Sequence, residues 1–197
     1  MKVIYIIIIL LQILLLYSTE ISFKKASELS IEAMSNFDKD LLEESIAMQR
    51  CLIIEDSTNS MLYYYLAQSE FYISDFNTVE TILLRGLKTN PSTEERALLL
   101  YQLGLFALVH NKEIYKDYLL QALNEHNKNP KRGDSISNIP LIWVLLDEKE
   151  KALNYLEGIT EEDIVNFKQF KEYISSLKKE EYLQAIRNLR NNFLLKK

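Results

Sequence analysis

Residues that break helices or build tight turns are scarce in this sequence. Only 4 glycines and 3 prolines occur among its 197 residues, while leucine, isoleucine, glutamate, lysine and tyrosine are abundant. Sandwiches and barrels of β-strands need many tight turns, and those turns depend largely on glycine and proline. The composition therefore predicts an all-α fold.

Cysteine is almost absent as well. The single cysteine, Cys51, excludes an internal disulfide, so the thiol content says nothing about the compartment. Cys51 lies in an apolar run with Met48 and Leu52, where a lone thiol is usually a small core residue. We therefore expect Cys51 to be buried.

The side-chain clusters that catalysis or metal binding needs are also lacking. His110 and His126 are the only histidines, and neither has a second histidine or a cysteine nearby at ligand spacing. Adjacent glutamates fall at solvated helix starts or faces, whereas a general acid needs burial. There is no glycine-rich phosphate loop. We expect no catalytic residue, no metal site and no cofactor.

The charge balance excludes one class of partner. The chain has 28 acidic and 23 basic residues, which gives a formal net charge of −5. No basic cluster stands apart from the acidic background. A surface of that sign repels phosphate backbones, so nucleic acid is not an expected partner.

The N-terminus is the one long apolar stretch. Lys2 precedes an apolar run from Val3 to Tyr17, which as a helix would span about 22 Å, short of the roughly 30 Å membrane core. This pattern is typical of a secretory signal. We expect residues 1–19 to be a cleaved signal peptide or an uncleaved anchor that contacts the membrane through residues 3–17; a soluble cytoplasmic protein is the remaining alternative. Both leading interpretations predict export to the periplasm or cell envelope. The Ile-, Lys- and Asn-rich usage is typical of an AT-rich bacterial genome.

The rest of the chain, residues 20–197, has the pattern of a single helical domain. Apolar side chains recur three and four residues apart in runs of roughly 12 to 18 residues. Ser92 and Glu95, directly after Pro91, have the spacing of a capping box at a helix start. The runs are separated by polar breaks at residues 36–39, 55–59, 74–75, 89–93, 111–112, 127–135 and 147–148. This alternation predicts antiparallel helix pairs joined by short loops.

Three of the predicted helices also repeat one another. The segments 43–52, 78–87 and 114–123 each close with a long polar residue, a small residue and leucine. The closing leucines, Leu52, Leu87 and Leu123, lie 35 and 36 residues apart. A period near 35 with two helices per unit indicates a helix-turn-helix solenoid. The alternative is a coincidence within a leucine-rich bundle.

Residues 61–91 carry the pattern of a known repeat. The first predicted helix has Tyr63, Leu66 and Ala67, the turn is Ser74-Asp75-Phe76, and the second helix has Val79, Leu83 and Gly86 before the closing Pro91. At these positions the segment resembles a tetratricopeptide repeat. The resemblance extends over roughly residues 25–190, more weakly outside this unit. A related two-helix repeat would fit the same pattern.

The resemblance implies a fold and a function. The fold is a right-handed α-α superhelix of about three to four helix pairs, whose first helices line a concave groove. Residues 170–189 resemble the helical tail that closes such arrays, and the charged side chains from Lys178 to Arg190 suit the polar outer face of a capping helix. The implied function is non-catalytic binding of a protein or peptide.

The family's groove positions select two sets of residues with helical spacing. They are Tyr64, Gln68, Phe71 and Tyr72 on one helix, and Tyr101, Leu105 and Leu108 on the next. Within each helix the spacing places side chains on one face. Three tyrosines among apolar side chains would favour an apolar partner segment over a charged one. In the alternative interpretation, the same side chains pack between neighbouring helices or against the C-terminal tail.

These observations leave functions of different classes open. The first is an exported adaptor that binds a protein or peptide segment in its concave groove. The second is a membrane-anchored accessory subunit of a bacterial envelope complex. A helical enzyme would require a deep pocket with clustered polar groups, which the sequence does not predict.

Overall fold

The computed structural model describes residues 22–130, 134–160 and 166–195. All regular secondary structure in these ranges is helical, which confirms the all-α prediction. None of the helices described in these ranges is long and apolar enough to cross a membrane. The predicted signal or anchor segment, residues 1–19, lies outside the described residues.

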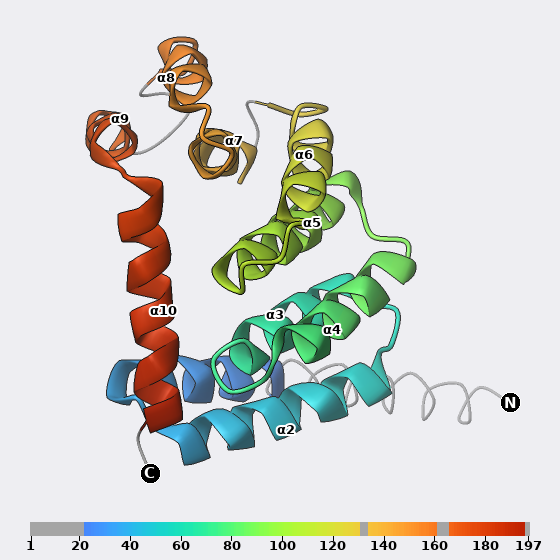
Figure 1. Ribbon diagram of the computed structural model, residues 1–197. Helices are drawn as coiled ribbons and strands as arrows, with labels where there is room; N and C mark the ends of the chain where they lie inside the picture. The colour runs from blue at the N-terminus through green and yellow to red at the C-terminus, as the bar shows by residue number, and fades with distance from the viewer. Residues whose placement is uncertain (1–21, 131–133, 161–165, 196–197) are drawn as a thin grey trace, which may run out of the picture.

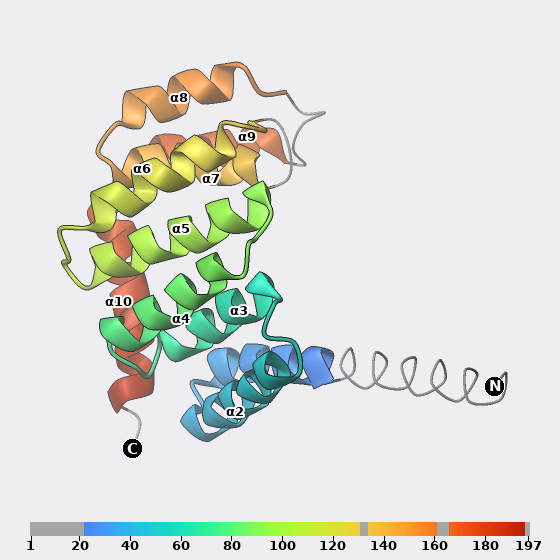
Figure 2. The same cartoon turned by 90° about the vertical axis from the view of Figure 1, so that its right-hand side faces the viewer.

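The helices follow one another with short connections and pack mainly against their neighbours in sequence (Figures 1 and 2). The contacts are most extensive within the pairs α3–α4, α5–α6 and α7–α8. The elements are a helix over residues 22–36, α2 (Lys39–Glu55), α3 (Ser60–Glu70), α4 (Phe76–Lys88), α5 (Thr93–Val109), α6 (Tyr115–His126), α7 (Ser135–Leu145), α8 (Lys149–Glu157), α9 (Phe167–Ser176) and α10 (Lys179–Leu195). Each predicted polar break coincides with a gap between two helices.

Four of the helix starts are fixed by side-chain caps. The carboxylates of Asp38 and Asp75, the amide oxygen of Asn59 and the hydroxyl of Ser92 each accept a hydrogen bond from a backbone N–H of the following helix. Ser92 and Glu95 form the predicted capping box, in which the Ser92 N–H donates to Glu95 Oε2 over 2.8 Å. These bonds satisfy donors that a helix start otherwise leaves without partners.

The predicted C-terminal tail is two helices, not one. The break lies at Leu177, whose extended backbone ends α9, and the hydroxyls of Ser175 and Ser176 donate to carbonyls one turn earlier. Such local bonds compete with continued helix. α9 packs on α7 and α8 through Ile174 and covers the last pair. α10 turns back along the side of the helix pairs (Figure 1), so the predicted capping position is wrong for α10.

Two glycines allow helices to approach closely. A Cβ on Gly86 of α4 would lie 2.9 Å from Tyr63 Cβ, and one on Gly104 of α5 would lie 2.5 Å from Leu119 Cδ2 of α6. Close packing therefore explains the small residue at Gly86, near the end of the second repeated segment. The equivalent residue of the first segment, Cys51, is exposed, so packing does not explain it, and the expectation that Cys51 is buried is wrong. The buried side of α2 is taken by neighbours of Cys51 such as Leu52.

A buried histidine links α6 to α7. His126, the last residue of α6, is 3% exposed, and its Nδ1 lies 3.0 Å from Ser135 Oγ at the start of α7. Burial, only partly opposed by Asp134, lowers the pKa of His126 from 6.5 to about 4. The imidazole is therefore neutral in the folded protein at physiological pH.

We predict that Gly104→Ala destabilises the protein although alanine is the better helix former. Overpacking against Leu119 costs about 1–3 kcal/mol, and the gain in helix propensity offsets about 1 kcal/mol of that cost. Urea unfolding should give a free energy of unfolding lower by up to about 2 kcal/mol. Gly158→Ala is the control, because its Cβ would meet its nearest atom at 3.5 Å. Equal stability of the two variants would contradict this packing.

His126 should make stability depend on pH. Because its folded pKa of about 4 lies below the unfolded value of 6.5, the unfolded chain binds the proton more tightly. Stability is thus lost as the pH falls from 6.5 through 4, by about 2 kcal/mol between pH 7 and pH 5 from this group alone. Urea unfolding of wild type and His126→Gln over this range should show a shallower decline in the variant. Parallel curves would count against a buried neutral imidazole.

Candidate functional site

Helix α10 lies against the residues that were expected to line a groove. We use the term inner face for the surface of α3, the turn after it and α5 that carries Gln68, Phe71, Tyr72, Tyr101 and Leu105. Tyr182 and Ile186 of α10 share with these helices a cavity of about 270 Å³, to which Gln68, Phe71, Tyr72 and Leu105 contribute. A helix of the same chain therefore covers part of the inner face.

The seven predicted groove residues are buried to different degrees. Phe71, Tyr101, Leu105 and Leu108 are buried, whereas Tyr64, Gln68 and Tyr72 are half-buried. Phe71 stacks on Phe106 of α5 with the ring centroids 4.1 Å apart, so it packs between helices. Part of the set thus takes the packing role that was the alternative interpretation, while Tyr72 faces α10.

Aromatic contacts fix the C-terminal end of α10. Phe193 is 1% exposed, and its ring centroid lies 5.2 Å from that of Tyr72 and 5.7 Å from that of Phe37. Phe37 has a φ of 52°, a left-handed conformation that a bulky residue rarely adopts. Its ring is placed between the helix over residues 22–36 and α10, so this end of α10 is held by apolar packing.

Two arginines of α10 bind oxygen atoms at the C-terminal ends of α3 and α5 and in the turns that follow them. Arg190 donates from Nε to the carbonyl of Phe71 over 2.9 Å and from Nη2 to the carbonyl of Ser74 over 2.8 Å. Arg187 donates from Nε to the carbonyl of Val109 over 3.2 Å and from Nη2 to Asn111 Oδ1 over 3.1 Å. The last carbonyls of a helix have no partner within it and form the negative end of its dipole. A guanidinium is well suited to that position. Neither arginine thus serves the outer cap that the sequence suggested.

The N-terminal end of α10 is held by lysines. Lys179 Nζ lies 2.7 Å from Asp147 Oδ2 and 5.2 Å from the ring centroid of Tyr115. Lys149 donates to the carbonyl of Leu177 over 3.0 Å. These contacts tie the turn between α9 and α10 to the connections around α6 and α8. The helix is thus anchored at both ends.

The tyrosines of this region carry no charge at neutral pH. Burial raises the pKa of Tyr64 to about 12 and the pKa of Tyr101 well above its ordinary value, with a further rise at Tyr101 from Tyr182. Burial also raises the pKa of Tyr72. The inner face therefore presents aromatic rings and neutral hydroxyls, which suits apolar and hydrogen-bonding side chains.

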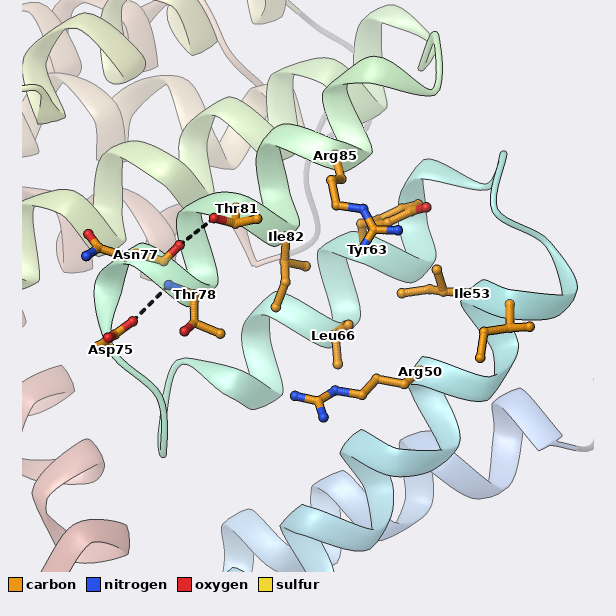
Figure 3. Close-up of a pocket in the computed structure, with 11 residues that line it drawn as sticks. Arg50, Ile53, Tyr63, Leu66, Asp75, Asn77, Thr78, Thr81, Ile82 and Arg85 are labelled. Carbon is orange, nitrogen blue, oxygen red and sulfur yellow. Dashed lines mark hydrogen bonds between the residues drawn. The ribbon is translucent and has the colours of Figure 1, made fainter.

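A second concave site lies between α2, α3 and α4 (Figure 3). This α2–α4 pocket has a volume of about 580 Å³ and an apolar floor made by Ile53, Leu66 and Ile82. Arg50 and Arg85 stand at its rim on α2 and α4 (Figure 3). Sequence reasoning missed the pocket, although Arg50 and Arg85 are the long polar residues at the close of two repeated segments.

The titratable groups of the α2–α4 pocket are engaged in fixed contacts. Arg50 forms a short ion pair with Glu70, whose side chain is 2% exposed and also accepts a hydrogen bond from Ser74. Arg85 lies over the ring of Tyr63, 5.4 Å from the centroid. Among the residues that the structure describes, no group of three or more His, Cys, Asp or Glu side chains is arranged to hold a metal ion. Contacts within the chain therefore hold both arginines in place at the rim of the pocket.

The chain has no match among protein-family models, curated proteins or solved structures. Two surfaces of the protein are candidate binding sites: the inner face, part of which α10 covers, and the α2–α4 pocket.

Proposed function

We propose that this protein is a non-catalytic scaffold whose inner face binds a helical segment of a protein partner. The observation that carries the proposal is that the inner face already holds a helix, α10, through Phe193, Arg187 and Arg190. A surface that binds a helix of its own chain has the shape and the side chains that it would need to bind a helix of a partner.

The proposed architecture is a right-handed superhelix of tetratricopeptide-type pairs. Support comes from the spacing of Leu52, Leu87 and Leu123 and from the contacts within the pairs α3–α4 and α5–α6. In such a superhelix, the helix over residues 22–36, α3 and α5 would line the concave side, and α10 would lie along that side. Each pair would bury its apolar face against the next pair.

The contacts of α10 specify the chemistry of the proposed partner. Tyr182, Ile186, Arg190 and Phe193 lie four, four and three residues apart, so they share one face of the helix. The partner segment would therefore be an amphipathic helix with apolar or aromatic anchors. It would also carry a basic residue that reaches the carbonyls of Phe71 and Ser74. The sequence alone predicted an apolar partner segment. The carbonyl groups near the helix ends add a preference for a basic side chain.

For location, we propose an exported protein of the periplasm or cell envelope. The apolar run of residues 3–17 supports this proposal. If that run is retained as an anchor, the protein would instead serve as a membrane-bound accessory subunit. The mass of the mature protein distinguishes the two, because cleavage near Ser18 to Glu20 removes the run.

The proposal predicts that α10 and a free helix compete for the inner face. The full chain with Arg190→Ala and Phe193→Ala should bind a labelled peptide of residues 178–195 at least tenfold more tightly than wild type does. Truncating a buried phenylalanine costs about 3–5 kcal/mol, which weakens the competing helix. Fluorescence anisotropy measures the affinities.

Two controls make this test specific. Asn192→Ala, on the exposed side of α10, should leave the affinity of the chain for the peptide unchanged. A peptide in which serine replaces the residues equivalent to Tyr182, Ile186 and Phe193 should not bind. Equal peptide binding by wild type and the double variant, or binding by neither, would refute the proposed use of the inner face.

A further inference from the structure

The α2–α4 pocket joins equivalent positions of two successive repeats. Arg50 and Arg85 each precede a small residue and a leucine at the close of a repeated segment, 35 residues apart. The fold brings both side chains to the rim of one pocket, from α2 and from α4 (Figure 3). In the third repeated segment the equivalent residue, Gln121, is uncharged and lines a different pocket, between α4 and α6. Of the three repeated segments, the first two therefore each contribute an arginine to this pocket, and the third does not.

The floor of the pocket is apolar, and an exposed isoleucine lies beside it. Ile53, Leu66 and Ile82 form the floor and are largely buried, whereas Ile54, which also lines the pocket, is 82% exposed. A large aliphatic side chain in contact with water at the edge of a concave apolar surface loses little entropy and gains burial when a partner covers it. The floor thus fits aliphatic side chains of a partner segment.

The charges at the rim favour an acidic group. Arg50 is neutralised by the buried carboxylate of Glu70, although its own side chain is 60% exposed. Arg85 forms no ion pair with any carboxylate in the described part of the chain, and its guanidinium lies over the Tyr63 ring. A guanidinium held in this way is pre-ordered and keeps free donors for a carboxylate.

Asp75, the carboxylate that lines the pocket, already accepts a hydrogen bond within the chain. Asp75 caps α4 by accepting from the backbone N–H of Thr78 over 2.8 Å, and this hydrogen bond is the main cause of its lowered pKa. Asp75 sits at the first turn of α4, whereas Arg85 sits near its last turn. A partner carboxylate placed at Arg85 is therefore separated from Asp75 by most of the length of α4.

We propose that the α2–α4 pocket is a second docking site, for a partner segment in which an acidic side chain is flanked by aliphatic ones. The carboxylate pairs with Arg85, and the aliphatic side chains pack on Ile53, Leu66 and Ile82. This site does not depend on the inner face, because α10 contributes no residue to the pocket.

A random peptide library selected on the full-length protein tests this proposal. The selection should enrich segments with Asp or Glu next to Leu, Ile, Val or Met. A synthetic peptide from the selection should bind Arg85→Ala about tenfold more weakly than wild type, because a charge-assisted bidentate contact is lost. Replacing the acidic residue of the peptide by its amide should weaken binding to wild type by about the same factor. The same replacement should leave the affinity for Arg85→Ala unchanged.

The control variants separate the site from a general charge effect. Lys88→Ala removes a positive charge from the same helix outside the pocket lining and should leave the affinity unchanged. Thr81→Trp fills the pocket without changing its charge and should abolish binding. Circular dichroism melts confirm that each variant is folded.

Other results would overturn the proposal. These are selected peptides without acidic residues, equal binding by wild type and Arg85→Ala, or binding that survives Thr81→Trp. A partner that is lost only with Arg190→Ala and Phe193→Ala would belong to the inner face instead. The failure of one site is therefore distinguishable from the failure of the other.

Discussion

The contact of Arg190 with the carbonyl end of α3 determines how the inner face is arranged. It joins residues that lie 119 and 116 positions apart in the sequence, and Arg187 makes an equivalent contact with the end of α5. Closing so long a stretch of chain costs entropy, but this cost grows only slowly with length. The burial of Phe193 and the satisfied helix ends offset it. Without these contacts, the aromatic side chains around Tyr72 would face water.

The inner face in turn depends on the close packing of the helices beneath it. Gly104 lets α5 approach α6, and Gly86 lets α4 approach both α3 and α5. Because protein interiors are packed at nearly crystalline density, one extra methyl group at either position would force neighbouring atoms to shift. The positions of Phe71 and Leu105 on the inner face therefore depend on residues that do not lie on it.

Much of the helical framework was predictable because its signals are local. The polar breaks, the capping box at Ser92 and Glu95 and the small residue at Gly86 depend on neighbours in sequence, and the structure contains all of them. The break at Leu177 was missed because no glycine or proline marks it between α9 and α10.

The sequence did not predict how helices that are distant in the chain pack against one another. Helical periodicity indicates that Phe71, Tyr101 and Leu105 share buried faces, but it does not specify what covers them. The exposure of Cys51 was mispredicted because the nearby Met48 and Leu52 do not show which face of the helix Cys51 occupies. The α2–α4 pocket was missed because it forms only when Arg50 and Arg85 are brought together by the fold.

Photo-crosslinking from α10 tests the central claim, that the inner face holds a helix, most directly. A benzophenone amino acid at position 186 of the full chain would sit in the cavity beside Gln68, Phe71 and Leu105. The account predicts adducts within one chain to α3, its following turn and α5, mapped by mass spectrometry. Adducts elsewhere, or only between two chains, would contradict it.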